Sequence, residues 1–525
     1  MRTWNHVPGL ALTGGLVVDG TGAPGRYATV LVRDGRIAAV GDNLPTDDLP
    51  SDVRHVDVSG RVVCPGFVDI HTHSDLTLLS DPRALSKVHQ GVTTEVVGNC
   101  GLGVTGPPRT ELRAAVSYLD LDPGVAWTWQ DLPGYLDAVA AAGPGVNVAA
   151  LVGHLVLRAL VCGFADRAAT PAELDTMRGL LADALDAGAV GLSTGLVYAP
   201  LPFAREDELV ALGEVTAAAG KVFTWHVRSY DDGLIDSVTQ AVTVARRTGC
   251  RTQISHLAAV GRRNWGAVRH ALDLVDAANA EGCSVGVDIY PYLHGNAPLA
   301  QLLPAWAQEG GPTAWVPRLS DDGVRARIRE AWRDRPTTWD EITVSWTARP
   351  VPALGRTIAD LGGDEAALDL LAQLGTGVMM TAGGRSEDDL RAVLAHPSAV
   401  VASDGQALDP DGVTGAGVPH PRSYGCFPRY LARYASDLPD AVRRCTSAPA
   451  ARVGLADRGV LREGAPADVV VFDPARLADR ATFTDPHRFA AGVDLVLVNG
   501  AVAVEGGTHT GTRAGRVLRQ RGAPC

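Results

Sequence analysis

The stretch VVCPGFVDIHTH, residues 62–73, decides the fold of the central part of this chain. An apolar, β-branched run ends here at His71 and His73, and residues i and i+2 of a strand project from the same face. The two imidazoles can therefore bind one metal ion together. Catalytic groups in a parallel β-barrel lie at the carboxyl ends of its strands, so this stretch predicts the first strand of a metal-binding barrel.

The chain downstream repeats the order of a short apolar strand followed by a helical stretch. The eight candidate strands end near His73, Cys100, His154, Thr194, His226, His256, Tyr290 and Asp404. Continuously apolar strands that alternate with helices indicate an α/β fold, a (β/α)8 TIM barrel, rather than an open sheet. The gap between Tyr290 and Asp404 is longer than one crossover needs. It predicts an inserted subdomain after strand 7, at about residues 295–350.

Both ends of the chain consist of short strands with turns. Residues 11–58 and 467–507 alternate apolar and polar positions around Asp-Gly and Asn-Gly turns, which is typical of antiparallel sheets. The two termini are expected to build one small β-sandwich together. The predicted boundaries are 1–62 for its N-terminal part, 63–446 for the TIM barrel, and 447–525 for its C-terminal part.

The overall composition excludes several classes of protein. A formal net charge of −12 over 525 residues gives no electrostatic support to a nucleic-acid partner. Residues 1–15 lack the pattern of a secretory signal, and no apolar run is long enough to span a membrane. Eight scattered cysteines without a CxxC pair favour a reducing cytoplasm over a disulfide framework or a zinc finger. The sequence indicates no oligomeric state.

The predicted strand ends carry a set of metal-binding and acid/base side chains. These are His71, His73, Cys100, His226, His256 and Asp404. A single histidine at a strand end is more often structural, but a set on one face of a barrel favours a metal centre. Imidazole, thiolate and carboxylate are all zinc ligands, and mixed sites with an open position are catalytic. Asp404 is the natural general base and, later, general acid.

Cys100, in the segment GNCG at the end of the second strand, is predicted to bridge two metal ions. Barrels of this type often use a carboxylated lysine or a carboxylate for that purpose, and this chain has only Lys87 and Lys221. Lys87 lies in a helix-like stretch after the first strand, and Lys221 begins the fifth strand at its opposite end. Neither is expected to bridge, which leaves the Cys100 thiolate.

Several motifs follow one another in a characteristic order: GFVDIHTHSD, QGVTTEVVGNCG, GLSTGLVYAP, WHVRS, QISHL, DIYPY, ASDG and HPRSYG. Together they resemble the N-acyl-D-amino-acid deacylases (D-aminoacylases) of the amidohydrolase superfamily, over about residues 11–519. The resemblance implies zinc-dependent hydrolysis of a small N-acyl-D-amino acid or a related N-acyl compound.

The resemblance also implies individual roles. Cys100, His226 and His256 would hold a tight zinc, and His71 and His73 would share Cys100 in a weaker second site. The remaining roles would be the catalytic acid/base for Asp404, a hydrogen bond to the scissile carbonyl for Tyr198, and binding of the substrate α-carboxylate for Arg422 and Tyr290.

Two positions depart from the family pattern on the carboxylate side. The family usually has a lysine two residues after the SH histidine, where this chain has Ala258, and a serine shortly after YPY, where it has Gly295 and Asn296. His294 or Arg262 are candidate replacements. Alternatively, the substrate is a specialised metabolite without a free D-α-carboxylate.

Two further alternatives stay open. One is a hydantoinase-like cyclic-amide hydrolase, although such enzymes generally use the lysine bridge. The other is a non-catalytic metal-containing scaffold, against which the presence of Asp404 argues.

Overall fold

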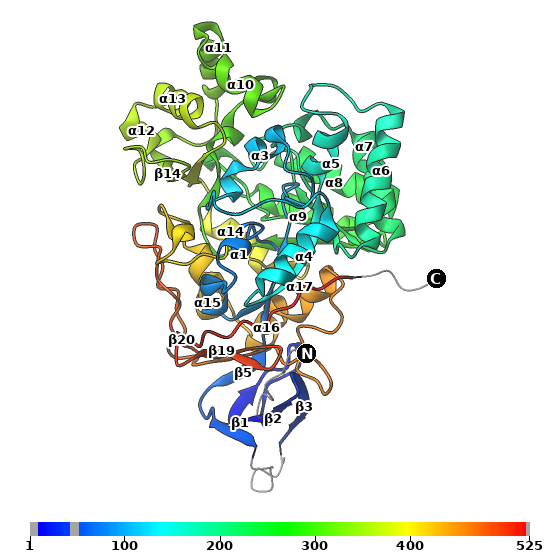
Figure 1. The fold of residues 1–525 in the computed structure, drawn as a ribbon, viewed down its shortest axis with the longest axis vertical. Coiled ribbons are helices and arrows are strands. Elements are labelled where there is room, and N and C mark those ends of the chain that lie inside the picture. The colour runs from blue at the N-terminus through cyan, green and yellow to red at the C-terminus, as the bar shows by residue number, and fades with distance from the viewer. Residues whose placement is uncertain (1–8, 43–51, 521–525) are drawn as a thin grey trace.

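The structure is a computed structural model that describes residues 9–42 and 52–520. A small β-domain lies at one end of the molecule, the barrel in the middle and an inserted subdomain at the other end (Figure 1). The expectation about a secretory signal rests in large part on residues 1–8, which lie outside the described residues. Within the described ranges, no helix combines the length and apolar character needed to cross a membrane.

Eight parallel strands form the central barrel, which confirms the predicted fold class. They pair in chain order from β6 to β12 and then to β16. Their bounds are β6 (Phe67–Asp69), β7 (Val92–Val97), β8 (Asn147–Gly153), β9 (Gly191–Gly195), β10 (Val222–His226), β11 (Arg251–Ile254), β12 (Val285–Ile289) and β16 (Ala399–Val401). Just beyond β16 and β6, the Asp404 N–H donates to the His71 carbonyl at 2.8 Å and the His73 N–H donates to the Gly405 carbonyl at 2.9 Å. The barrel therefore closes where the predicted ligands lie.

Helices surround the barrel, and several of the longer ones bury an apolar stripe against it. In α8, for example, Val238, Ala241 and Ala245 are buried, the i, i+3, i+7 spacing of one helical face. The capping box of Thr170 and Glu173 starts α6. The helices outside the insertion are α1 (Thr77–Ser80), α2 (Leu85–Val88), α3 (Thr110–Ala115), α4 (Leu132–Ala142), α5 (His154–Val161), α6 (Pro171–Asp186), α7 (Glu206–Ala218), α8 (Leu234–Thr248), α9 (Ala267–Ala280), α14 (Glu387–Ala395), α15 (Arg422–Arg433), α16 (Leu438–Cys445) and α17 (Ser447–Arg452).

The insertion between β12 and β16 is a subdomain with its own core. Its antiparallel sheet has the order β13 (Gly295–Pro298), β15 (Val378–Ala382), β14 (Ile342–Thr347). Its helices are α10 (Pro312–Arg318), α11 (Asp322–Trp332), α12 (Ile358–Leu361) and α13 (Asp364–Leu374). Its apolar cluster runs from Leu299 to Met380. The subdomain extends past the expected end near residue 350, because its central strand is the last one in the sequence.

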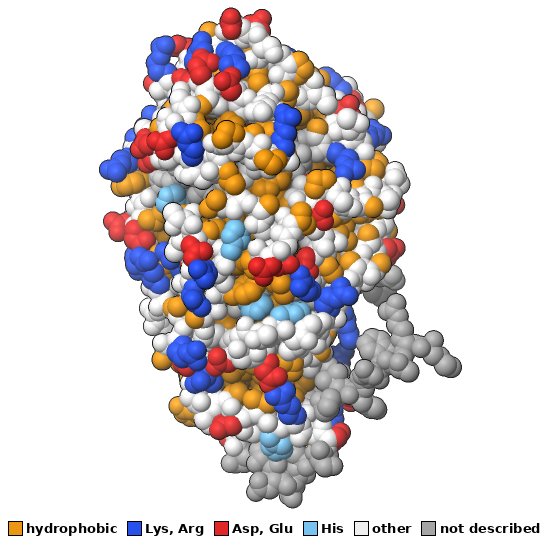
Figure 2. All heavy atoms as spheres, turned by 60° about the vertical axis from the view of Figure 1, so that its left-hand side comes forward, with side chains coloured by type: hydrophobic (Ala, Val, Ile, Leu, Met, Phe, Trp, Pro, Cys, Tyr) orange, Lys and Arg blue, Asp and Glu red, His pale blue; other side chains and the backbone are white. Residues whose placement is uncertain are grey.

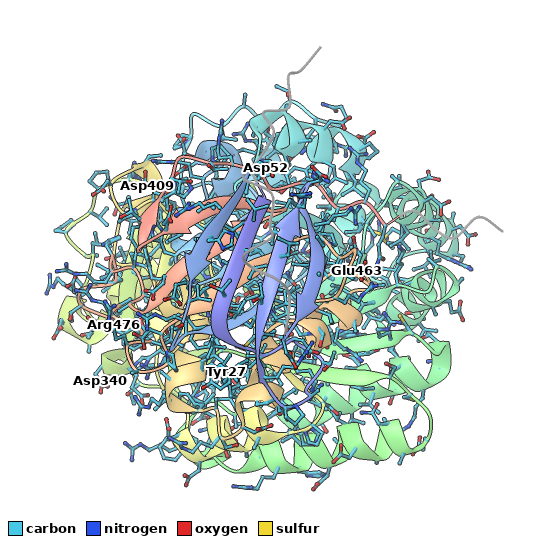
Figure 3. The ribbon with its side chains drawn as sticks, turned by 90° about the horizontal axis from the view of Figure 1, so that it is seen from below. Tyr27, Asp52, Asp340, Asp409, Glu463 and Arg476 are labelled. Atoms are coloured by element: carbon cyan, nitrogen blue, oxygen red, sulfur yellow. The ribbon has the colours of Figure 1, made fainter. Side chains whose placement is uncertain are left out.

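The two termini share one nine-stranded sheet, in which β5 of the N-terminal part pairs antiparallel with β17 of the C-terminal part. Its strands are β1 (Gly9–Val17), β2 (Arg26–Arg33), β3 (Arg36–Gly41), β4 (Val53–Asp57), β5 (Val62–Pro65), β17 (Val469–Phe472), β18 (Val493–Val498), β19 (Ala501–Glu505) and β20 (Thr508–His509). Apolar side chains from both parts form one core. Seen from below, β-strands of this domain lie in front of the barrel (Figure 3).

Two boundaries differ from the expected ones by a few residues. Residues 62–65 belong to the terminal sheet as β5, so the first barrel strand begins at Phe67 rather than at residue 63. At the other boundary, Ala450 and Val453 pack with barrel residues such as Val68 and Val400. The segment around α17 therefore belongs with the barrel, because its apolar side chains cover the barrel bottom.

The outer surface mixes charges of both signs. Figure 2 shows Lys and Arg side chains interspersed with Asp and Glu side chains over the face that it draws, without a large area of one sign.

Candidate active site

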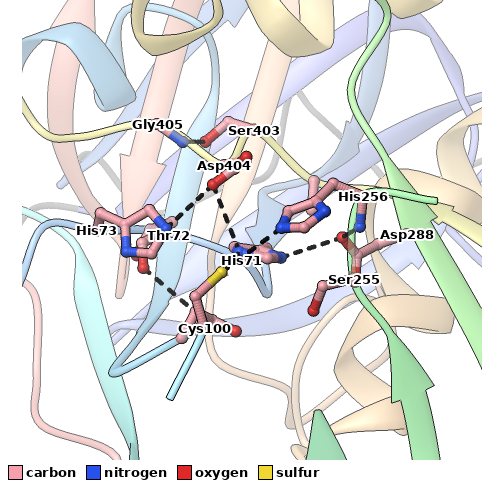
Figure 4. Close-up of polar contacts among 12 residues, drawn as sticks. His71, Thr72, His73, Cys100, Ser255, His256, Asp288, Ser403, Asp404 and Gly405 are labelled. Carbon is pink, nitrogen blue, oxygen red and sulfur yellow. Dashed lines mark hydrogen bonds and ion pairs between the residues drawn. The ribbon is translucent and has the colours of Figure 1, made fainter. Parts of the chain in front are cut away.

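The predicted metal and acid/base side chains gather at the carboxyl ends of the barrel strands, and Figure 4 shows five of them: His71, His73, Cys100, His256 and Asp404. Cys100 Sγ lies 3.2 Å from His71 Nε2 and 3.5 Å from His256 Nε2. Asp404 Oδ1 lies 3.1 Å from His73 Nε2 and 3.4 Å from His71 Nε2. The strands bring these residues together although they lie up to 333 positions apart in the sequence, since parallel strands all end at one rim.

Three residues of the site adopt a left-handed backbone conformation. Cys100, His256 and Asp404 have φ angles of 56°, 37° and 52°, in a region that costs a residue other than glycine about 1–3 kcal/mol. The surroundings hold the chain in place: a Cβ atom added at Gly195 would lie only 1.9 Å from the Cys100 carbonyl oxygen. Each of the three residues lies two or three positions after the end of its strand, and its left-handed conformation lets its side chain lie at the barrel mouth.

The donor set fits two metal ions that share a thiolate. The ligand atoms of two groups lie within 4.8 Å of one another: His71, His73, Cys100 and Asp404, and Cys100, His226 and His256. Both ring nitrogens of His226, and Nδ1 of His73, are buried without a hydrogen-bond partner among the described residues. Buried polar groups normally have a partner, so these nitrogens are suited to ligating an ion.

The charges of the site favour an ionised thiolate and carboxylate. Burial alone would raise the pKa of Cys100, but the adjacent His71 and the imidazoles of His226 and His256 outweigh burial and hold it well below its usual range. Burial likewise opposes ionisation of Asp404, yet Arg422, His71 and His73 hold the pKa of that carboxyl well below its usual range. Asp404 is therefore held as a carboxylate at neutral pH.

The histidines fall into two electrostatic classes. Burial lowers the pKa of His226, despite the Cys100 thiolate, so this imidazole is neutral and ready to ligate. For His71 and His73, Cys100 and Asp404 outweigh burial; the pKa of His71 is raised well above its usual range and that of His73 to about 9. An ion must displace protons from these two rings.

Asp288, on β12, is a site residue that the sequence analysis missed. Its Oδ1 lies 3.1 Å from His71 Nδ1 and accepts the His256 N–H at 2.9 Å, while Gln253 donates to its Oδ2 at 3.2 Å. A carboxylate of this kind orients a ligating imidazole and raises its basicity. The signal was present in the strand VGVDI, where one carboxylate interrupts an apolar strand next to the predicted site.

The predicted substrate-binding residues line the same mouth. The Tyr198 hydroxyl donates to Gln301 Oε1 at 3.1 Å, and its ring centre lies 5.0 Å from that of His226. The Arg422 guanidinium packs 4.6 Å from the centre of the Tyr290 ring, and its Nη1 lies 2.8 Å from Asp404 Oδ2. Arg422 is thus paired with Asp404 itself.

A cavity of about 500 Å³ opens onto Cys100, His226, His256 and Asp404. A smaller, mostly apolar cavity of about 50 Å³ adjoins it on the side of His73 and Tyr198 and is lined by residues such as Leu102, Leu119, Trp346 and Met379. Neither His294 nor Arg262, the candidate replacements on the carboxylate side, lines either cavity. Arg262 instead stacks on Trp265, with its guanidinium 5.3 Å from the ring.

Two other predicted features lie outside the metal cluster. His154 begins α5 and bonds to Thr194 Oγ1 at 3.0 Å and Glu208 Oε1 at 2.8 Å, so it is a structural histidine. Lys221 Nζ donates to the Gln520 carbonyl at 2.8 Å, at the opposite end of the barrel. The Lys87 amine likewise lies outside the metal cluster, where it pairs with the carboxylates of Asp69 and Glu95 inside the barrel.

A parallel barrel with a mixed imidazole, thiolate and carboxylate cluster at its mouth defines a metal-dependent hydrolase of the amidohydrolase type. Residues 54–504 match the model of the amidohydrolase family, and the chain belongs to this family. It is 38% identical to an N-acyl-D-glutamate deacylase of Alcaligenes xylosoxydans xylosoxydans, over 97% of this chain and 96% of that protein. A D-aminoacylase of the same bacterium is 36% identical, over 98% of each chain.

The solved structures agree with these relatives. The crystal structure of N-acyl-D-glutamate deacylase from Bordetella bronchiseptica, complexed with zinc and a phosphonate inhibitor, matches with a TM-score of 0.82 at 36% identity, over 97% of this chain and 99% of that chain. The predicted resemblance to the deacylases is thereby confirmed. An L-hydantoinase from Arthrobacter aurescens, at 16% identity and a TM-score of 0.54 over 97% of this chain and 99% of that one, shares the fold alone.

Proposed function

We propose that this protein hydrolyses the amide bond of N-acyl-D-amino acids or of a related small N-acyl compound. One water is consumed, the C–N bond breaks, and a carboxylate and a free amine leave. The observation that carries the proposal is the Asp404 carboxylate, held ionised within 3.1 Å of His73 Nε2 at the edge of the shared metal cluster. The relatives that act on N-acyl-D-amino acids match the chain over almost its whole length.

Zinc is the metal we assign to the cluster. Cys100, His226 and His256 would hold it tightly, and His71 and His73 would share Cys100 in a weaker second site, since protons compete for those two rings. When bound, zinc supplies Lewis-acid activation of the water and the carbonyl. The solved relative that contains zinc supports this choice.

The remaining steps belong to side chains of the chain. Asp404 would accept a proton from the attacking water and then deliver it to the leaving amine nitrogen, so one carboxylate serves as base and acid. Tyr198 would donate a hydrogen bond to the scissile carbonyl oxygen, which gains negative charge as the water adds. Tyr290 and Arg422 would face the carboxylate of the substrate, and the small apolar cavity would receive the acyl group.

The cellular setting completes the proposal. We place the protein in the cytoplasm, because the seven cysteines of the described residues are all free thiols, as is usual in a reducing compartment. The binding partner that we propose is a small N-acyl compound rather than a macromolecule, as the names of the relatives suggest. The hydantoinase alternative is supported by likeness of fold only, and the chain lacks a lysine that bridges the metal ligands.

The test incubates zinc-loaded protein with N-acetyl-D-amino acids, their L-enantiomers and hydantoins. Deacylation is measured by the release of free amine, and ring opening of hydantoins by the formation of the N-carbamoyl amino acid. Replacement of Asp404 by Asn should lower kcat by about 10²–10⁴-fold while zinc content stays unchanged. Asp409→Asn is the matched control, because Asp409 is buried nearby but pairs with Arg83 outside the metal cluster. Hydantoin turnover without deacylation would refute the proposal.

A further inference from the structure

Arg385 is a cation of the large cavity that lacks an anionic partner. The loop between β15 and α14 carries it into the cavity wall, where its guanidinium lies 4.9 Å from the centre of the Tyr290 ring. Its Nη1 is buried without a hydrogen-bond partner, and Arg385 forms none of the ion pairs found within residues 9–42 and 52–520. A guanidinium nitrogen that is buried without an acceptor is costly unless an anion binds to it.

The other arginines of the mouth are already engaged. Arg263 pairs with Asp232, Arg335 lies 3.5 Å from Asp364, and Arg422 lies 2.8 Å from Asp404. Arg228 donates to Gln240 Oε1 at 2.8 Å and to backbone carbonyls, including that of Pro202 at 3.0 Å. Among these cavity arginines, Arg385 is the one for which the described residues offer neither an ion pair nor a side-chain hydrogen bond.

The two departures from the deacylase pattern lie on either side of this guanidinium. A Cβ atom added at Gly295 would lie 3.0 Å from Arg385 Nη2, so the serine expected near this position would crowd the arginine. Ala258 lines one small cavity together with Arg385 and Tyr292. Arg385 therefore lies beside both positions at which the chain departs from the family pattern.

We propose that Arg385 binds the free carboxylate of the substrate, in place of the lysine absent at Ala258. This inference rests on the proposed function and specifies its substrate class as N-acyl amino acids with a free carboxylate, rather than amides or esters without one. The α-carboxylate is separated from the scissile amide nitrogen by a single carbon atom, so its site must lie near Asp404. Arg385 and Arg422 flank the same Tyr290 ring, and the planar guanidinium of Arg385 can bind both carboxylate oxygens.

The test compares N-acetyl-D-leucine with its methyl ester in the zinc-loaded enzyme. Arg385→Ala should lower kcat/KM for the free acid by about 30-fold or more, because it removes one partner of a desolvated charge pair, and most of the change should fall on KM. Amide hydrolysis of the methyl ester, which has no charge to bind, should stay within about threefold of the wild type. Arg385→Lys should retain part of the preference for the acid.

Arg391→Ala is the matched control, because Arg391 also packs on a tyrosine, Tyr434, at 4.9 Å but pairs with Glu387 outside both cavities. It should leave both substrates unaffected. If Arg385→Ala lowers turnover of acid and ester alike, or of neither, Arg385 has only a structural role and the inference fails while the deacylase function stands.

A binding measurement separates this inference from the proposed function. Calorimetric titration of zinc-free protein with N-acetyl-D-leucine should show binding that Arg385→Ala weakens and Arg391→Ala does not. Equal binding by both variants would overturn the role of Arg385 even if no substrate is ever turned over. Absence of turnover by the wild type, with binding that depends on Arg385, would instead refute the proposed reaction alone.

Discussion

Replacement of Lys87 by Met tests how the barrel interior supports the site. Lys87, on α2, extends its amine into the barrel, where Nζ lies 2.9 Å from Asp69 Oδ2, 3.1 Å from Glu95 Oε1 and 2.8 Å from Ser403 Oγ. The side chains of the lysine and of both carboxylates are completely buried. Removal of the amine would leave two buried carboxylates without their cation.

The size of the effect follows from these contacts. Loss of one partner of a buried ion pair costs about 3–5 kcal/mol, because the remaining charge is uncompensated. Without Lys87, the negative charge of Glu95 would be poorly compensated. The Ser74 hydroxyl would still donate to Oε1 at 2.9 Å, but Oε2 has no hydrogen-bond partner within the described residues. With an unfolding entropy of about 2.1 cal/mol/K per residue, a cooperative unit the size of this chain would lose about 3–5 °C of melting temperature.

The loss should also depend on pH. Burial raises the pKa of Glu95, and Lys87 is the neighbour that counteracts the rise most strongly. Without the lysine this pKa rises further. A carboxyl whose pKa is raised by folding favours the folded state below its unfolded pKa and loses that contribution as pH rises through the folded pKa. Lys87→Met should therefore be more destabilising at pH 8 than at pH 5.

The assay is thermal unfolding at both pH values, with Lys221→Met as the matched control. Lys221, the only other lysine of the chain, bonds to Gln520 and has no carboxylate within ion-pair distance among the described residues. Its replacement should cost less than half as much and show no comparable pH dependence. Equal shifts for the two variants, or a larger loss for Lys87→Met at pH 5, would refute the reasoning.

Three further predictions concern the metal cluster. Cys100→Ala should remove most of the bound zinc, measured by elemental analysis, because both ligand groups share this thiolate; retention of two ions per chain would contradict the shared-ligand geometry. Zinc affinity of the site with His71 and His73 should rise with pH by about tenfold per pH unit for each proton displaced, and so by up to about a hundredfold per unit while both rings are protonated; this slope should fall above about pH 9, where His73 has lost its proton, and a titration with no pH dependence would argue against these ligands. Asp288→Asn should weaken zinc binding about 10–100-fold in a chelator competition, since Asp288 orients His71 and the His256 backbone, and an unchanged affinity would reject that role.

Local sequence patterns were sufficient to predict the barrel and the side chains that gather at its mouth. A run of apolar residues specifies a buried strand, and the residue after such a strand lies at the rim in every parallel barrel. The positions of His71, His73, Cys100, His226, His256 and Asp404 could therefore be predicted without knowing which strands were neighbours. The spacing of His71 and His73 is a purely local property of a strand.

Other features depended on contacts between distant parts of the chain. Lys87 was expected in a helix-like stretch and does lie in α2, but only the fold brings its amine to Asp69, Glu95 and Ser403. The end of the insertion was expected near residue 350, because nothing local shows that the strand at Val378–Ala382 pairs with β13 and β14.

The sequence by itself thus determined the fold class and which candidate ligands gather at the barrel mouth, while the tertiary structure decided how these side chains are oriented and which neighbouring groups support them. The departures at Ala258 and Gly295 were visible in the sequence as two separate absences. Only the structure places Arg385 beside both, although it lies 127 positions from Ala258 and 90 from Gly295 along the chain. The physical reason is that charge compensation acts through space, so no pattern of neighbouring residues encodes which cation stands beside a given cavity.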